Sequence, residues 1–435
     1  MSHGTRNTDR TIAVEGLARV EGEGSLRAVV RDGVVEEVEL EIFEPPRFFE
    51  ALLRGRDYLE PPDITARVCG ICPVAYQMSS CAAIEDACGV TVTSEIAALR
   101  HLLYCGEWIQ SHALHVYLLH APDFLGCEDA VELAERDRPA VERGLALKRI
   151  GNLIMETVGG RAVHPVNVRV GGFYRAPSRE QIAALAGPVR VARDLALATV
   201  EWVAGFDFPD VEGEYLFVAL HDPVRYAIDS GRVRSSAGVD TDAAGFRAAI
   251  VEEQVARTTA LQSRLFGRDA YLTGPLARYA LNRDQLGPLA SGAAHAAGLG
   301  DVCHNPFRSI VVRSVELVEA CDQALGVIEM YEPPSPASVD VPPRAGTGTG
   351  ATEAPRGVLL HSYEIGVDGL ITSAQIVPPT SQNQLSIEAD LRRVVQSGLD
   401  LPDDELARRC EQAVRNHDPC ISCAAHFLDV EVVRA

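Results

Sequence analysis

Two Cys-x-x-Cys pairs lie near opposite ends of this 435-residue chain. Cys69 and Cys72 occur in RVCGICP, and Cys420 and Cys423 occur in DPCISCAAH. Two thiolates three residues apart can bind one metal ion when the turn between them is tight, as Gly70 permits in the first pair. If all four sulfurs bind the same site, the two ends of the chain must meet.

Spacing alone leaves the metal open. Four sulfur ligands suit zinc, iron or nickel. A structural zinc site with four cysteine ligands is the default interpretation, and redox disulfides or a coincidence of spacing are the alternatives. The other seven cysteines occur singly, where a small buried apolar side chain is the simplest interpretation.

The composition excludes some functions. Lys and Arg number 40 against 61 Asp and Glu, a net charge of -21 that argues against nucleic-acid binding. The polar start MSHGTRNTDR and the lack of an apolar run of about 18 residues predict a cytoplasmic protein with no membrane span. GTGTG at 346–350 is weak evidence for a dinucleotide loop, because no helical pattern follows it.

The hydrophobic pattern predicts an α+β fold, predominantly helical, with long central helices between N- and C-terminal β-hairpins. Residues 25–43 alternate apolar and polar around Asp32-Gly33, a pair that favours a tight hairpin turn. A second hairpin is expected over 357–377 and a short helix over 403–417. Apolar residues at helical spacing predict further helices at 73–121, 133–160, 179–205, 242–265 and 306–331.

We expect a single domain over 1–435. Residues 12–72 form its N-terminal β region with the first cysteine pair, and 73–331 its helical body. Pro and Gly are so dense around 333–355 that we expect 332–356 to be a connector without regular structure. Residues 357–435 form the C-terminal β region with the second cysteine pair.

The sequences around the cysteines are more specific than their spacing. RVCGICPVAYQMSS and DPCISCAAH resemble the two signatures of the [NiFe] hydrogenase large subunit. The resemblance implies the fold of that subunit and the reversible heterolytic cleavage of H2. Further matches continue in order along the chain: RVEGEG (19–24), RFFEALLRGRD (47–57), GRAVHPVNVRVGGF (160–173), EAPRG (353–357) and VPPTSQN (377–383).

The resemblance implies a set of metal ligands. Cys69 and Cys420 would be terminal ligands of nickel. Cys72 and Cys423 would bridge nickel to an iron that carries one carbon monoxide and two cyanides. Glu50 and His426 would bind magnesium or a similar hard ion, which would tie the C-terminus to the N-terminal region.

The same resemblance implies catalytic roles. Glu21 would relay the proton taken up by Cys420. Arg356 would lie over the open metal position, held by Asp123 and Asp418.

A further contact to the diatomic ligands is implied at 377–383. Thr380 would hydrogen-bond the second cyanide, or Pro379 would occupy that place in an alternative alignment.

Some residues depart from the family pattern. Glu23 replaces a usual His, Tyr76 stands where many membrane-bound relatives have His, and Ala82 occupies a position that is commonly basic or His. PPRFFEA and CGICPVAYQMS instead resemble the soluble, pyridine-nucleotide-linked branch that includes the sulfhydrogenases. The implied partners are an iron-sulfur small subunit and flavin- and NAD(P)-binding diaphorase subunits.

The sequence leaves three questions open. A maturation endopeptidase would remove the tail after His426, unless LDVEVV is retained as a strand. A hydrogen-sensing regulatory subunit would use the same site at low turnover. A non-catalytic subunit of the respiratory complex I type shares the expected fold, but such subunits lack the four cysteines that are present here.

Overall fold

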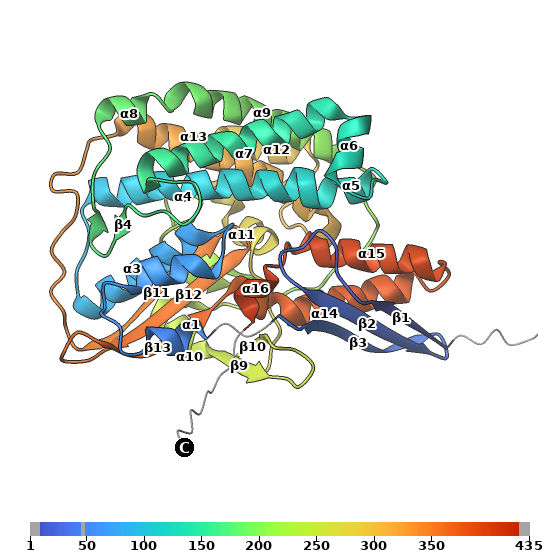
Figure 1. Ribbon diagram of the computed structural model, residues 1–435. Helices are drawn as coiled ribbons and strands as arrows, with labels where there is room; N and C mark the ends of the chain where they lie inside the picture. The colour runs from blue at the N-terminus through green and yellow to red at the C-terminus, as the bar shows by residue number, and fades with distance from the viewer. Residues whose placement is uncertain (1–8, 45–47, 426–435) are drawn as a thin grey trace, which may run out of the picture.

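The structure is a computed structural model, and it describes residues 9–44 and 48–425. Four long helices form the upper layer in Figure 1: α4 (Ser94–Leu114), α7 (Arg138–Gly159), α9 (Ala186–Ala204) and α13 (Ser309–Met330). Helix α4 packs against α7 and α13, and α13 also packs against α9. The long central helices were predicted, and the α+β, predominantly helical fold class is confirmed.

The N-terminal hairpin is present with one more strand than predicted. β2 (Gly24–Arg31) pairs antiparallel with β3 (Val34–Ile42), and β1 (Arg10–Val14) adds to the outer edge of β2. Asp32 and Gly33 both have positive φ, 49° and 76°, as the tight turn requires. The sheet packs on α14 (Pro379–Ser397), a helix that the sequence analysis did not predict.

The C-terminal region is a three-stranded antiparallel sheet, β11 (Gly346–Ala354), β12 (Gly357–Ile365) and β13 (Ile371–Val377). The β12–β13 hairpin was predicted. The expectation of no regular structure through 332–356 was wrong, because its last part is strand β11. The glycines of GTGTG serve close packing on α3 (Pro73–Cys88): a Cβ on Gly350 would lie 2.5 Å from the carbonyl oxygen of Ser79.

The prediction of a helix over 242–265 was also wrong, except for its first turns. Helix α10 (Ala243–Ala249) ends where β9 (Ile250–Gln254) begins, and β9 pairs with β10 (Leu261–Leu265). Short segments with mixed apolar spacing fit both the helical and the strand period, and here the pairing of two strands determines the structure.

The remaining elements are short, apart from the predicted C-terminal helix α15. They are α1 (Phe49–Leu53), α2 (Pro61–Thr65), η1 (Ala66–Val68), the π-helical η2 (His115–His120), α5 (Ala121–Phe124), α6 (Ala130–Arg136), β4 (Val168–Arg169), β5 (Gly172–Phe173), α8 (Arg179–Ala183), β6 (Val218–His221), β7 (Arg232–Ser235), β8 (Asp240–Thr241), α11 (Pro275–Asn282), η3 (Arg283–Gln285), α12 (Pro288–Ala296), η4 (Pro306–Arg308), α15 (Asp403–Asn416) and α16 (Ile421–Ala424).

The two ends of the chain meet near the middle of the molecule, where the red helix α16 lies between α3 and the N-terminal sheet (Figure 1). Glu21 and Cys420 form a parallel β-bridge, and the backbone N–H of Ile421 donates to the carbonyl of Glu21 at 2.9 Å. Within the described part of the chain, no helix is long and apolar enough to cross a membrane.

Candidate metal centre

The first cysteine pair lies in the turn between η1 and α3. Cys72 directly precedes α3, which begins with Pro73, a residue suited to the first helical position because it needs no N–H there. The backbone N–H groups of Ile71 and Cys72 both donate to Sγ of Cys69, at 3.3 Å each. These contacts turn the Cys69 sulfur toward Cys72.

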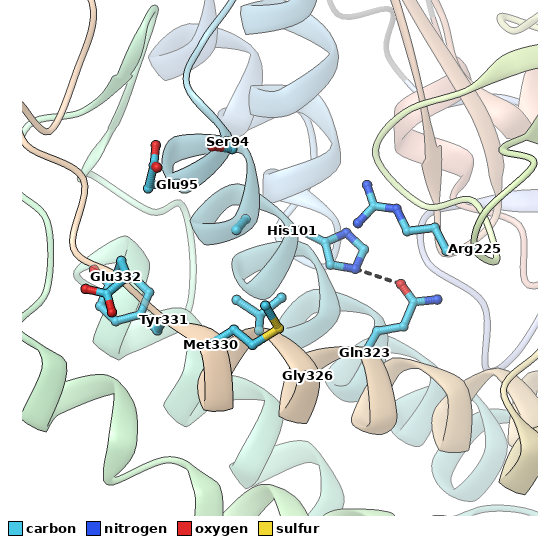
Figure 2. A pocket seen from close by; sticks show the side chains of 11 residues that line it. Ser94, Glu95, His101, Arg225, Gln323, Gly326, Met330, Tyr331 and Glu332 are labelled. Carbon is cyan, nitrogen blue, oxygen red and sulfur yellow. Dashed lines mark hydrogen bonds between the residues drawn. The ribbon is translucent and has the colours of Figure 1, made fainter.

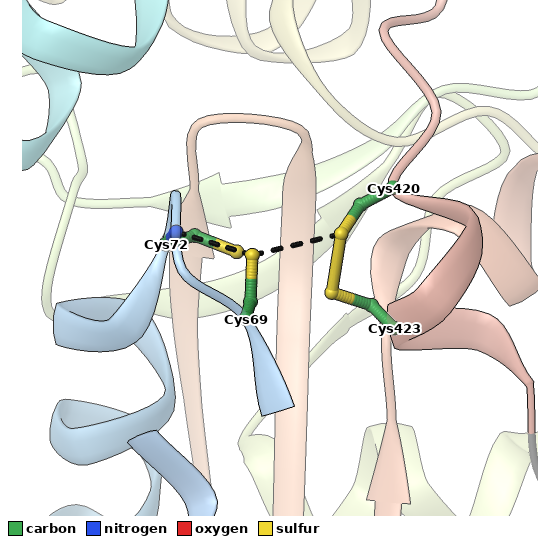
Figure 3. A group of neighbouring side chains, drawn as sticks. All are labelled: Cys69, Cys72, Cys420 and Cys423. Carbon is green, nitrogen blue, oxygen red and sulfur yellow. Dashed lines mark hydrogen bonds between the residues drawn. A yellow bond between two sulfur atoms is a disulfide. The ribbon is translucent and has the colours of Figure 1, made fainter. Parts of the chain in front are cut away.

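The second pair flanks the start of α16. The backbone N–H of Cys420 donates to Oγ1 of Thr380 at 2.9 Å, which ties this pair to the first turn of α14. Cys420 and Cys423 are joined as a disulfide in the structure (Figure 3). Both must be reduced to bind a metal, because thiolates are the ligands.

All four sulfurs form one buried cluster. Cys69, Cys72, Cys420 and Cys423 place their sulfur atoms within 4.8 Å of one another. Sγ of Cys69 lies 3.6 Å from Sγ of Cys420, and Figure 3 shows the two pairs facing each other. Such a set of converging soft donors fits a thiophilic transition metal. The predicted metal cysteines are therefore brought together.

Arg356 provides positive charge beside the sulfurs. Its Nε donates to the carbonyl oxygen of Asp418 at 2.8 Å and its Nη2 to the carboxylate at 3.1 Å, with both side chains about 3% exposed. Its Nη1 is buried and makes no hydrogen bond within the described residues. A hydrogen bond from Cys72 and the charge of Arg356 both lower the pKa of the Cys69 thiol.

Glu21 lies directly against the second pair. Its Oε2 is 3.1 Å from Sγ of Cys420 and accepts the backbone N–H of Ser422, also at 3.1 Å. Its side chain is half-buried, so it links the buried sulfur to the surface of the protein. This is the arrangement expected of a proton acceptor at Cys420.

Asp123 does not hold Arg356, so that prediction was wrong. Asp123 instead pairs with Arg19 at 2.5 Å and with Arg415 at 2.8 Å. The π-helical turn η2 ends directly before α5, and α5 carries Asp123 to the wall of a charged surface groove between those two arginines. Of the two predicted carboxylates, only Asp418 contacts Arg356.

Two acidic side chains, Glu50 and Glu252, lie near each other, and Glu50 lines a small cavity together with Cys423. Oε1 of Glu50 accepts the backbone N–H of Ile376 at 2.7 Å, and burial raises the pKa of Glu50 to about 7. Glu252 is close enough to raise that pKa further, and burial raises its own pKa to about 7. A small cavity here is lined by Phe49, Glu50, Val68, Ile376, Ser422, Cys423 and Ala425.

This acidic group fits a hard divalent ion. Oε1 of Glu252 is buried and has no hydrogen-bond partner among the described residues. A bound cation would remove the cost of keeping two carboxylates buried together. The other predicted ligand, His426, lies outside the described residues, as does the tail that follows it.

Glu107 is a site residue that the sequence analysis missed. It is fully buried in α4, and its carboxylate accepts the backbone N–H groups of Val74 at 2.6 Å and Ala75 at 3.1 Å. Burial raises its pKa well above the ordinary value. It thereby caps the first turn of α3, directly after Cys72. The sequence signal that could have identified Glu107 is an acidic residue within the apolar helical pattern of 94–114.

Tyr76 is one of the residues that depart from the family pattern, in which many membrane-bound relatives have His. Its ring is buried and lies edge-on to His361, with the ring centroids 5.5 Å apart. Its hydroxyl makes no hydrogen bond within the described residues. The sequence favours packing or hydrogen bonding over metal binding for five histidines, and all five make such contacts. His101 bonds Asp229, His112 pairs with Glu316, His115 bonds the carbonyl of Arg415, His120 packs against Phe124, and His164 bonds the carbonyl of Ala66.

A larger cavity, of about 510 Å³, lies elsewhere, beside α4 and the end of α13 (Figure 2). His101 is on its wall, with Nε2 2.7 Å from the side-chain oxygen of Gln323 and Nδ1 2.9 Å from Asp229. Arg225, Met330 and Glu332 also line it, and none of the cysteines of the metal cluster does. The cavity is therefore separate from the cluster.

Comparison with known proteins identifies the family. The sequence model of nickel-dependent hydrogenases matches residues 47–146 and 310–426. Sulfhydrogenase 2 subunit alpha of Pyrococcus furiosus is 33% identical, over 96% of this chain and 99% of the relative. Sulfhydrogenase 1 subunit alpha of the same organism is 31% identical, over 97% and 99%. The chain belongs to the nickel-dependent hydrogenase family.

Solved structures agree with this assignment. An NAD+-reducing [NiFe]-hydrogenase in its H2-reduced state superposes on this hydrogenase subunit with a TM-score of 0.86, at 26% identity, over 96% of this chain and 99% of the other. The NiFeSe hydrogenase of Desulfovibrio vulgaris Hildenborough shares the fold, with a TM-score of 0.77. The chain is thus a catalytic hydrogenase large subunit. Its family is nickel-dependent, so the cysteine cluster fits a nickel site better than the structural zinc site that the cysteine spacing alone would favour.

Proposed function

We propose that this subunit cleaves H2 reversibly and heterolytically at a nickel–iron site held by its four clustered cysteines. The observation that carries the proposal is the placement of Glu21, 3.1 Å from one of four buried sulfurs that lie within 4.8 Å of one another. Soft donors and an adjacent proton acceptor are together what heterolytic cleavage requires.

The cysteines would divide into two kinds. Cys69 and Cys420 would be terminal nickel ligands, and Cys72 and Cys423 would bridge nickel to an iron with one carbon monoxide and two cyanides. When bound, the two metals would polarise H2 and accept its electrons. The low exposure of all four sulfurs excludes bulk water, which strengthens the electrostatic interactions around them.

The proton would leave through Glu21. Cys420 takes it up, and the neighbouring carboxylate accepts it across the 3.1 Å contact. The backbone N–H of Ser422 fixes the same carboxylate oxygen in place. Because Glu21 is half-buried, it can pass the proton toward the surface.

Arg356 and Thr380 would contact the diatomic ligands. The unpaired Nη1 of Arg356 is free to donate to a cyanide nitrogen or to orient H2, while Asp418 holds the rest of the guanidinium. Oγ1 of Thr380 accepts the N–H of Cys420, so its own hydroxyl proton is available for the other cyanide. This favours Thr380 over Pro379, which has no side-chain donor.

Magnesium or a similar ion would stabilise the C-terminal end. Glu50 and His426 would be its ligands, and Glu252 would contribute its buried Oε1, which has no hydrogen-bond partner among the described residues. The cavity lined by Glu50, Cys423 and Ala425 would hold the ion, which would stabilise α16. Removal of the tail after His426 by a maturation endopeptidase would complete this closure.

Electrons would leave through partner subunits. Among the described residues, the four cysteines are the only group of three or more Cys, His, Asp or Glu side chains close enough to hold one metal ion, so no iron–sulfur relay is found in this part of the chain. We propose an iron-sulfur small subunit, and beyond it flavin-containing diaphorase subunits that reduce NAD or NADP in the cytoplasm. The similarity to an NAD+-reducing hydrogenase supports this acceptor.

Assay of the complex purified from its host tests the proposal against a hydrogen sensor. H2-dependent reduction of NAD+ or NADP+ that disappears in a Cys420→Ser variant would support catalysis. Slow turnover with artificial dyes and none with either pyridine nucleotide would instead favour a sensor.

A further inference from the structure

The position of Arg356 depends on a tight turn. Strand β11 ends at Ala354 and β12 begins at Gly357, and these two residues face each other across the hairpin. Pro355 and Arg356 are therefore the two turn residues. The guanidinium of Arg356 lies at the end of this turn, so any movement of the turn backbone moves the guanidinium relative to the sulfurs.

Arg278, in α11, holds this turn with its whole side chain. It donates to the carbonyl oxygens of Ala354 and Pro355 and to the carboxylate of Glu353, each at 3.0 Å. Its remaining N–H groups make a bidentate pair with Glu316 at 2.7 Å each. All five guanidinium N–H donors are thus used, and the side chain is 0% exposed.

The backbone of α11 touches the same turn. Gly274, directly before the helix, has φ +108°, and a Cβ there would lie 2.6 Å from the carbonyl oxygen of Arg356. Only glycine permits this close approach. The helix therefore contacts the turn at two points, through Gly274 and through Arg278.

Side chains from two long helices hold Arg278 in place. Although burial opposes ionisation, the charge of Arg278 lowers the pKa of Glu316 to about 2. Glu316, in α13, therefore stays negatively charged and pairs with Arg278. The guanidinium carbon of Arg278 lies 4.4 Å from the ring centroid of Trp108 in α4. The ring N–H of Trp108 donates to the carbonyl of Glu353 at 2.9 Å. Two long helices thus brace the contact.

We infer that Arg278 is a positioning residue for hydrogenase turnover, which places Arg356 over the metal site by holding the carbonyls of the two residues before it. The inference rests on the proposed role of Arg356. No contact joins Arg278 to the cysteines among the described hydrogen bonds and ion pairs, so its effect must pass through the turn.

The test is Arg278→Lys in the assembled, nickel-loaded complex. An ammonium has three donors in place of five and cannot pair bidentately, so the turn loses contacts while the buried charge remains. We expect kcat for H2 oxidation to fall roughly 10- to 100-fold, as for a small misplacement of a catalytic group. We also expect the cyanide stretching bands in the infrared spectrum to shift, with nickel content unchanged.

Arg100→Lys is the matched control. Arg100 is also buried, pairs bidentately with Glu85 and donates to one carbonyl oxygen, that of Arg169, but its hydrogen bonds reach neither the turn nor the four clustered cysteines. It should match Arg278→Lys in thermal destabilisation without shifting the cyanide bands. Equal band shifts in the two variants would overturn the inference.

A double variant separates this inference from the proposed function. If Arg278 acts through Arg356, adding Arg278→Lys to Arg356→Lys should lower kcat by no more than about twofold. A further loss as large as in the wild-type background would overturn the positioning role. Full activity of Arg356→Lys alone would instead refute the proposed role of Arg356.

Glu353→Gln provides a second route if Arg278→Lys does not fold. One oxygen of Glu353 accepts from Arg278 and the other accepts the backbone N–H of Leu220 at 2.7 Å. An amide can satisfy only one of these donors. We expect a kcat loss of roughly three- to tenfold that vanishes in the Arg356→Lys background. A loss that persists there would overturn the inference.

Discussion

Replacing Glu21 by Gln would remove the proposed proton acceptor while keeping its size. Oε2 of Glu21 lies 3.1 Å from Sγ of Cys420 and accepts the N–H of Ser422 at 3.1 Å. An amide oxygen can still accept that N–H, so the backbone contact survives. The amide cannot take up a proton near neutral pH, and the route from Cys420 to the surface is interrupted.

The magnitude follows from these two contacts. Loss of a positioned general base typically lowers a rate about 10²- to 10⁴-fold, which corresponds to about 3–5 kcal/mol of activation free energy. The stability cost is limited to weakening one hydrogen bond to a charged acceptor, about 1 kcal/mol. Turnover should therefore collapse while nickel content and melting temperature stay near wild type.

The assay is H2 oxidation with an artificial dye, measured beside nickel content. Glu23→Gln is the control, because Glu23 is exposed and lies two residues from Glu21, and because this substitution removes the same charge. We expect full activity in Glu23→Gln. If Glu21→Gln retained more than about a third of wild-type kcat, or if its activity loss followed a loss of nickel, the proton-relay role would be refuted.

Three further predictions test other parts of the account. Cys72→Ser should abolish nickel binding, because an alcohol is a far poorer donor to nickel than a thiolate, whereas Cys81→Ser, in the helix α3 that follows Cys72, should retain nickel in elemental analysis. Glu252→Gln should alter the pH dependence of the metal-free subunit: burial raises the pKa of Glu252 from 4.5 to about 7, so wild type loses stability as pH rises from 4.5 to 7, and the variant should gain up to about 3 kcal/mol over wild type at pH 8. Denaturant titrations that show the same difference at pH 4.5 and pH 8 would contradict this. Gly350→Ala should lower the free energy of unfolding by about 1–3 kcal/mol because its Cβ would meet the α3 backbone, whereas Gly292→Ala, in open space, should not.

The sequence predicted the features that depend on local chemistry. Asp32-Gly33 specified a hairpin turn because few residue pairs tolerate two positive φ angles. The cysteine signatures predicted the metal cluster and the meeting of the chain ends, and Glu21 and Asp418 lie where the resemblance implied. Each of these signals is carried by a few neighbouring residues.

Features that depend on distant contacts could not be predicted in this way. The glycines of β11 resemble a flexible connector until α3 is known to pack on them. Asp123 was assigned to Arg356 from a short motif, but two other arginines, Arg19 and Arg415, compete for it in three dimensions. Arg278 makes its hydrogen bonds across separations of 38 to 77 residues, and no local sequence pattern indicates them.

The central claim, a nickel–iron site on the four clustered cysteines, is tested most directly by an infrared spectrum joined to metal analysis of the same purified complex. The account predicts stretching bands of carbon monoxide and cyanide together with one nickel and one iron per large subunit. Zinc in place of nickel, with no such bands in a fully matured sample, would contradict it and return the cysteines to a structural role.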